Sequence, residues 1–226
     1  MPTVVSSITY PNARNLGQLR SDLAAALGFS AAGASVGVLA NIIDLKLRDA
    51  NKLLYEAHDW VKLKFYTDVA LGTNQYLIDY PTHANPERIK AISVLRGSVW
   101  SAPLPKGITP EMYTTQDNTS WPQRWEPYQQ IELWPKADQI YTLRIFYIRA
   151  LARFTQDADY PTVDEDLVYL VALARLKAHY RQPDAKVYAD DANALLASLK
   201  AKSWGKDTFS PYDYCSEEAL VKPEVV

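Results

Sequence analysis

Hydrophobic positions near the amino terminus recur at intervals of three and four residues, the spacing of one face of an α-helix. Leu16, Leu19, Leu23 and Leu27 form such a stripe, and Gly28 ends it. After a linker of small residues, a longer stripe predicts an amphipathic helix over about residues 35–66. Its apolar members are Leu39, Ile43, Leu47, Ala50, Leu54, Ala57 and Val61.

The pattern changes after residue 63, where short β-rich runs alternate with Pro, Gly and Asn. Predicted strands cover residues 64–71, 75–80, 89–95, 130–134 and 141–150. Residues 101–127 contain five prolines, too many for a central strand. They are therefore predicted to form a long excursion from the sheet.

Helical spacing returns after Pro161, where Thr162 and Glu165 form the pattern of a capping box. The third helix predicted there is apolar on nearly every side and should be covered on several sides. Its apolar residues are Leu167, Val168, Leu170, Val171, Leu173, Ala174, Leu176 and Ala178. A fourth helix starts at Pro183 and ends near Gly205, with the stripe Tyr188, Ala192, Leu195 and Leu199.

These elements predict an α+β fold that is mainly α. It consists of an antiparallel four-helix bundle, an inserted small β-sheet or barrel lobe, and an extended C-terminal tail. We assign residues 15–66 and 160–204 to the bundle and 67–159 to the β lobe. Residues 1–14 form an N-terminal arm, and 205–226 form the tail.

Composition narrows the classes of function. The formal net charge of the 226 residues is −2, and no block of five or six Lys and Arg residues occurs, so the electrostatic footprint of a nucleic-acid-binding protein is missing. Cys215 is alone, which excludes an intramolecular disulfide. We expect a soluble protein, because no secretory signal or membrane-spanning apolar stretch is recognisable.

No pattern of catalytic or ligand-binding residues is recognisable. His58, His83 and His179 do not have the spacing of metal ligands. The acidic cluster at residues 164–166 suits the dipole at the start of a helix. Neither a phosphate-binding loop nor a Gly-x-Ser-x-Gly turn occurs. We therefore predict no catalytic residues, no metal and no cofactor.

Aromatic side chains are the unusual feature, with 15 Tyr and 6 Trp. Those of the β lobe are Trp100, Tyr113, Trp121, Trp125, Tyr128 and Trp134. Such side chains either stack on sugar rings or pack in cores and protein interfaces, and we favour packing and protein contact. In the tail, Phe209, Tyr212 and Tyr214 lie in a Pro-containing polar segment, the composition of a strand that becomes ordered on a partner.

Four segments, in this order, resemble the head-to-tail adaptor proteins of short-tailed and related bacteriophages, also called connector or tail tubular protein A-like proteins. They are NIIDLKLRDANKLLYEAHDW, YLIDYPTHANPERIKAISVLRG, WPQRWEPYQQIELWP and LRIFYIRALARFTQDADYPTVDEDLVYLVALARLKAHY, within residues 15–202. The resemblance implies a structural virion protein without an active site, located at the head-tail junction and assembled in the host cytoplasm. It implies a dodecameric ring of this chain under the portal, with genomic double-stranded DNA passing through its channel and no membrane contact.

The same resemblance divides the contacts between two ends of the subunit. Trp204, Phe209, Tyr212 and Tyr214 would dock on the portal or a neighbouring subunit. Trp100, Tyr113, Trp121 and Trp125 would face the tail nozzle, tail tube or fibre proteins. Two alternatives stay open: a virion-associated carbohydrate-binding or cell-wall-degrading protein, and a bacterial regulatory or scaffolding protein with the same bundle.

Overall fold

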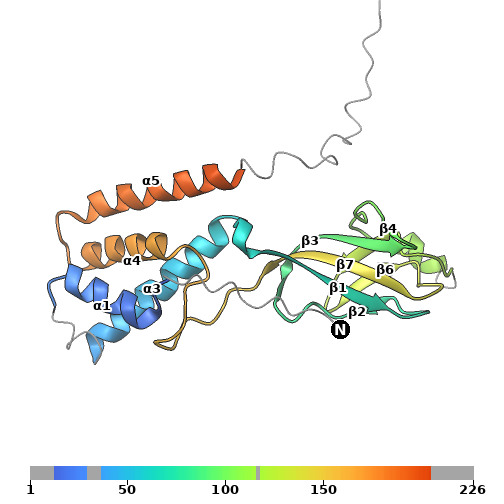
Figure 1. Cartoon of the computed structure of the whole chain (residues 1–226), viewed down its shortest axis with the longest axis horizontal. Coiled ribbons are helices and arrows are strands. Elements are labelled where there is room, and N and C mark those ends of the chain that lie inside the picture. Colours follow the sequence, from blue (N-terminus) through green and yellow to red (C-terminus); the bar gives the residue numbers. More distant parts are fainter. Residues whose placement is uncertain (1–12, 30–36, 116–117, 205–226) are drawn as a thin grey trace, which may run out of the picture. The chain divides into compact units, whose positions relative to one another are not determined.

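A computed structural model describes residues 13–29, 37–115 and 118–204, which form two compact units (Figure 1). The helical unit contains residues 16–54 and 163–204, and the β unit contains 55–162 together with 13–15. The described helices are α1 (Leu16–Ala26), α3 (Val38–Ala57), α4 (Glu165–His179) and α5 (Ala185–Trp204). The strands are β1 (Lys64–Leu71), β2 (Leu77–Ile78), β3 (Ala84–Arg96), β4 (Val99–Trp100), β5 (Arg124–Pro127), β6 (Ile131–Trp134) and β7 (Tyr141–Arg149), with 3-10 turns η1 (Val61–Leu63) and η2 (Pro110–Thr115).

The helical unit is built on the apolar stripes of its helices. Most residues of the two predicted stripes in α1 and α3 are completely buried: Leu16, Leu19, Leu23, Ile43, Leu47, Ala50 and Leu54. Ala24, which was outside the predicted stripe, is also completely buried, whereas Leu39 is half-buried and Ala57 is exposed. In α4, one completely buried row consists of Val168, Ala172 and Leu176. The stripe of α5 is only half buried apart from Ala192, so α5 is the least covered of these helices.

A buried ion pair joins α1 to α3. Arg20 donates from Nε and Nη2 to the two carboxylate oxygens of Asp44, at 2.7 and 2.9 Å. Only 10% and 12% of the two side chains is exposed, so both charges have lost most of their hydration. Each charge is therefore stabilised chiefly by the other, which fixes how the two helices pair.

The turn between α4 and α5 is also held by a charged side chain. Lys177, which is buried, donates from Nζ to Asp184 at 2.6 Å and to Gln182 at 3.0 Å. Its ammonium group lies 4.8 Å from the centre of the Tyr188 ring on α5. The contacts link the end of one helix to the first turns of the next.

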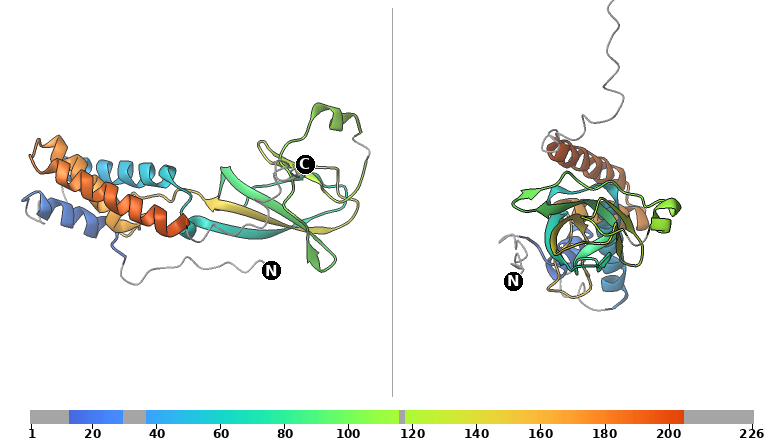
Figure 2. Two further views of the ribbon diagram at one scale, coloured as in Figure 1. Left: turned by 90° about the horizontal axis from the view of Figure 1, so that it is seen from above. Right: turned by 90° about the vertical axis from the view of Figure 1, so that its right-hand side faces the viewer.

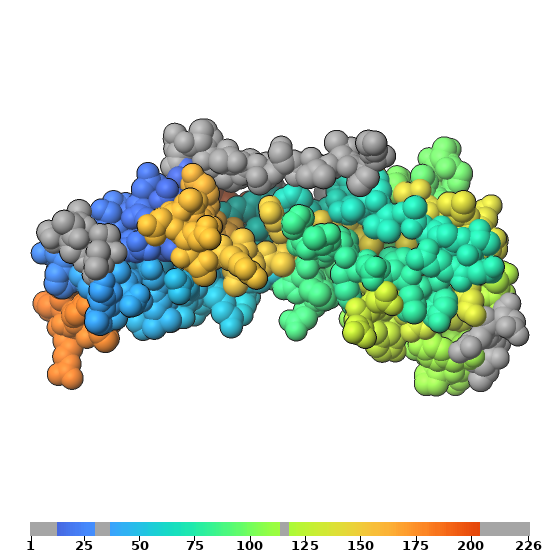
Figure 3. All heavy atoms as spheres, turned by 90° about the horizontal axis from the view of Figure 1, so that it is seen from below, coloured from blue at the N-terminus to red at the C-terminus, as the bar shows by residue number. Residues whose placement is uncertain are grey.

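The β unit contains two antiparallel sheets. One has the strand order β1-β7-β3-β4 and the other β2-β6-β5, and the end-on view of Figure 2 shows them curving as a half-barrel. β3 has two register shifts against β7, one between Ala84 and Ile89 and one between Ile89 and Ala91. The spheres of Figure 3 show that side chains fill the spaces between the ribbons of this unit.

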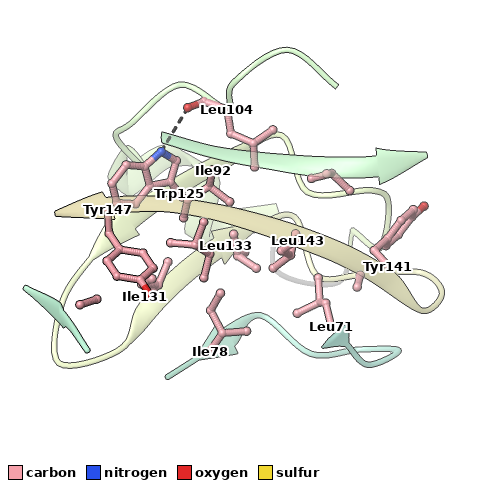
Figure 4. Packing of buried hydrophobic residues seen from close by; sticks show 14 residues of the cluster. Leu71, Ile78, Ile92, Leu104, Trp125, Ile131, Leu133, Tyr141, Leu143 and Tyr147 are labelled. Atoms are coloured by element: carbon pink, nitrogen blue, oxygen red, sulfur yellow. Dashed lines mark hydrogen bonds between the residues drawn. The ribbon is translucent and has the colours of Figure 1, made fainter. Parts of the chain in front are cut away.

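One hydrophobic core lies between the two sheets (Figure 4). Ile92, Leu143 and Ile145 enter it from the four-stranded sheet, and Ile131 and Leu133 enter it from the other, all with at most 1% exposed. Trp125 lies in the same core with 3% exposed, and its indole Nε1 donates to the carbonyl of Leu104 at 3.1 Å. Burying the ring therefore leaves no unpaired N–H group.

The C-terminal end of α3 is capped by the guanidinium of Arg88 on β3. Arg88 donates to the carbonyls of Tyr55 at 3.0 Å and His58 at 3.1 Å, which satisfies acceptors that a helix end leaves unpaired. Arg88 and Lys90 also hydrogen-bond to the carboxylate of Asp59. Burial raises the pKa of Asp59, but the hydrogen bonds and the two positive charges outweigh it, so that the pKa lies below its ordinary value of 3.8.

Several predictions from the sequence are wrong. The fold is not a mainly α four-helix bundle with a small lobe, because residues 55–162 form two antiparallel sheets with a core of their own. The second helix ends at Ala57, not at residue 66, because Arg88 donates hydrogen bonds to carbonyls at its C-terminal end and a 3-10 turn follows.

The supposed excursion at 101–127 contains β5, and β4 just before it was also missed. Pro127 is tolerated because β5 is an edge strand. Finally, α4 is capped by the side chain of Asp164, which accepts from the N–H of Leu167 at 3.1 Å, and not by Thr162.

Replacing Arg20 by Met should destabilise the helical unit by about 3 kcal/mol, because the carboxylate of Asp44 would stay buried without its main partner. Replacing both residues, by Arg20→Met with Asp44→Leu, should recover most of that loss. Urea unfolding of the two single variants and the double variant measures the coupling. If the loss of stability in the double variant equals the sum of the losses in the two single variants, the two side chains are not coupled.

Acid should weaken the β unit through Asp59. Because its pKa is lower in the folded chain than in the unfolded one, the carboxylate contributes stability above about pH 4, and this is lost as the pH falls through the lowered pKa. Asp59→Asn should therefore lower the melting temperature at pH 7 and have little effect near pH 2. Asp190→Asn, at an exposed position of α5, is the matched control, expected to change neither. An Asp59→Asn effect that is equal at both pH values would refute this account.

Candidate functional site

In the part of the chain that the structure describes, no three His, Cys, Asp or Glu side chains lie close enough together to hold a metal ion. None of the helices described is both long and apolar enough to cross a membrane. The candidate site is a surface that could bind another macromolecule.

The outer side of the four-stranded sheet carries an ordered group of aromatic residues. Leu143, Ile145 and Tyr147 of β7 point into the core, so Arg144 and Phe146 between them point outward. The register places Tyr66 of β1 opposite Phe146 and Asp68 opposite Arg144. Trp100 of β4 lies opposite Leu95 of β3. We call Tyr66, Trp100, Arg144 and Phe146 the aromatic face.

Arg144 holds this face together. Its guanidinium donates twice to the carboxylate of Asp68, both at 2.8 Å. The same group lies 4.5 Å from the centre of the Tyr66 ring and 4.1 Å from that of Trp100. The rings of Tyr66 and Phe146 are 5.9 Å apart. The aromatic side chains are thus ordered before any partner binds, which lowers the entropic cost of binding.

The charges on the aromatic face are paired. The hydrogen bond from Arg144 holds the pKa of Asp68 below its ordinary value, so the carboxylate is ionised at neutral pH. The surface that a partner could contact is therefore mainly aromatic, with 58% of Tyr66 and 36% of Phe146 exposed. Aromatic residues and Arg are enriched in protein interfaces, and this sheet presents them together. The face can therefore bind protein by burial of its rings.

A groove of about 250 Å³ lies elsewhere on the β unit. Its lining is mainly aromatic and apolar, from Tyr80, Pro86, Glu87, Ile89, Lys106, Trp125, Pro127 and Tyr128. Tyr80 donates to the carbonyl of Tyr128 at 2.8 Å, and burial raises its pKa, so the hydroxyl is neutral. Glu87 is the one carboxylate in this lining. Hydrolysis of a glycosidic bond by the usual route needs two.

The structure separates the four aromatic residues predicted to meet the tail. Trp100 lies on the aromatic face. Tyr113 lines a hollow of about 60 Å³, where its hydroxyl donates to Glu132 at 3.1 Å. Trp121 packs against the core, under the guanidinium of Arg96 at 4.6 Å. Trp125 is inside the core and offers almost no surface. The four side chains therefore have different environments.

The predicted docking residues of the tail cannot be placed in the same way. Trp204 is the last residue of α5. Phe209, Tyr212 and Tyr214 lie outside the described residues.

Sequence reasoning missed most of the aromatic face. Tyr66, Arg144 and Phe146 were not singled out, although all three lie in predicted strands. The available signal was alternation, because Thr142 and Arg144 interrupt an apolar series at every second position, and Phe146 continues their side of the strand. An Arg between aromatic residues on the outer side of a strand marks a surface worth testing.

A helical unit is joined to a two-sheet unit, and one sheet presents the kind of ordered aromatic surface through which proteins contact partners. The comparison with protein families agrees. The chain belongs to the SU10 adaptor protein family, whose model matches residues 14–212. This is a family of structural phage head-tail adaptors, not of enzymes, so the protein is a virion component of the head-tail junction. No curated protein matches the chain.

Replacing Arg144 by Met should raise the pKa of Asp68, because the hydrogen bond that stabilises its carboxylate is lost. NMR titration of the carboxyl carbons measures this. Asp159 is a matched reference, since its pKa is lowered by backbone N–H groups of Gln156 and Thr155 and should not move. Titration of Asp68 at the same pH in both proteins would show that Arg144 does not hold it in solution.

Proposed function

We propose that the protein is the subunit of an adaptor ring that connects the portal of a tailed bacteriophage to its tail. Membership of the head-tail adaptor family supports assembly with portal and tail components. The observation that carries the assignment of surfaces is the aromatic face. It is exposed, ordered by Arg144, and supported by a sheet whose other side is core.

We assign the aromatic face to the tail side of the ring. Trp100, one of the four residues predicted to contact tail proteins, lies on the aromatic face. Tyr66 and Phe146 add exposed ring area to the same face. We assign the contact with the portal or a neighbouring subunit to the C-terminal tail. Its anchors would be Trp204, Phe209, Tyr212 and Tyr214. The division gives one subunit two separate docking elements, as a connector requires.

A dodecameric ring, assembled in the host cytoplasm, would enclose a channel through which genomic DNA passes during ejection. The formal net charge of −2 suits a channel that does not hold DNA, because each phosphate that Lys or Arg neutralises adds affinity.

The structure does not favour the carbohydrate-binding or cell-wall-degrading alternative. Sugar rings stack on open aromatic faces, but Arg144 lies over both Tyr66 and Trp100. Trp125 is in the core. The aromatic residues are better matched to a protein partner with its own apolar surface.

Reassembly of virions tests the two docking elements separately. Heads that carry portal but lack this protein would be mixed with purified chain, and ring formation and tail attachment would be followed by electron microscopy. The double variant Tyr66→Ser with Phe146→Ser should still bind heads but attach fewer tails, by at least about tenfold, because each buried ring contributes roughly 1–3 kcal/mol. A chain truncated after residue 205 should fold but fail to bind heads.

A matched control is Val187→Ser with Tyr160→Ser, which removes exposed apolar surface elsewhere and should behave as wild type. Normal tail attachment by the Tyr66 and Phe146 double variant would overturn the tail-side assignment. Normal head binding by the truncated chain would overturn the role of the C-terminal tail. Failure of the intact chain to bind heads would overturn the adaptor-ring proposal itself.

A further inference from the structure

The four-stranded sheet has an unpaired side along β1. β1 pairs with β7 and is the edge of the strand order β1-β7-β3-β4. In the described parts of the chain, no further backbone hydrogen bond reaches residues 65–71 from another element. Every second residue of an edge strand points its N–H and C=O groups away from the sheet, so β1, with eight residues, offers about four such positions.

The core is also open along this edge. Phe65 and Val69 point toward the core from β1 but are only partly buried. Leu71, at the end of the same strand, is completely buried. Thr67 lies between them and shares a hydrogen bond of 3.0 Å with the hydroxyl of Tyr147 on β7. A further strand beside β1 would cover Phe65 and Val69, as β1 itself covers part of β7.

The sequence contains a segment that fits this edge. Residues 3–10, TVVSSITY, lie between Pro2 and Pro11 and number eight, the length of β1. Five of the eight are β-branched, and the chain has no charged side chain before Arg14. At alternate positions, Val4, Ile8 and Tyr10 share one side of an extended strand with Ser6. Prolines at both ends stop pairing there.

We propose that residues 3–10 add to the free edge of β1 in the same chain, as an antiparallel fifth strand of the sheet. Val4, Ile8 and Tyr10 then cover Phe65 and Val69. The same chain is favoured because residues 13–15 group with the β unit and follow the segment after only Pro11 and Asn12. Pairing within the chain closes a short loop, which costs less than joining two molecules.

The antiparallel direction follows from the connections of the chain. Residues 13–15 lead into α1, and β1 begins seven residues after the end of α3 at Ala57. The end of residues 3–10 and the start of β1 are thus each next to a link to the helices. Pairing them therefore sets the end of the segment beside the start of β1. The added strand would widen the sheet next to Tyr66 and remove an edge on which other chains could pair.

Hydrogen exchange of the full chain, followed by mass spectrometry, tests the proposal. A peptide covering residues 64–71 should be protected in the wild type and lose protection at about four amides when residues 2–11 are deleted. Peptides of β7 should not change. Ile8→Lys, which places a charge against the core, should release the strand, and Ser7→Lys, on the opposite side, should not.

Protection that stays constant over about a hundredfold dilution supports a strand from the same chain, whereas protection lost on dilution would assign it to a second copy and overturn the proposal. Equal exchange of residues 64–71 in the wild type and the deletion variant would mean that the edge is empty. Equal behaviour of Ile8→Lys and Ser7→Lys would refute the assignment of the two sides. The experiment does not depend on the adaptor role.

Discussion

The surfaces of the β unit depend on one constraint: two sheets bury their inner sides against each other, and the largest residue between them, Trp125, must keep its N–H group bonded. Leu104 supplies the carbonyl, so the irregular residues around it are held against the core. They are held further by the N–H of Leu104, which donates to Ile92 of β3 at 2.7 Å. A surface can be rigid only if its support is, and the aromatic face stands on this packed layer.

Short-range patterns predicted the elements that depend on them. The β-rich run at residues 64–71 predicted β1 with its observed bounds, and the run at 141–150 predicted β7 within one residue. Periodicity could not choose the buried side of α4, which is apolar nearly all round: Val168 is completely buried and Leu170 only partly. In the amphipathic α3, the predicted stripe agrees with the core from Ile43 to Leu54, but Ala57 and Val61 at its end are exposed.

The parts that the sequence did not predict come from contacts between distant residues. Arg88 ends α3 from a strand about thirty residues away, and no local rule for helix ends includes it. Arg144 meets Asp68 across 76 positions, so the aromatic face exists only after β1 and β7 pair. Trp100 could be singled out as an aromatic residue, but its neighbours could not. β5 was hidden by prolines that an edge strand tolerates.

The register shifts of β3 mean that this strand is sensitive to its length more than to its composition. Arg88, within the first shift, caps the end of α3, and residues after both shifts, among them Ile92, pack in the core. Inserting or deleting one residue between 85 and 90 would turn every later side chain of the strand to the opposite side. Related chains should therefore vary freely in the side chains of this stretch that face solvent, such as Glu87, while keeping the number of residues between Ala84 and Ala91 constant.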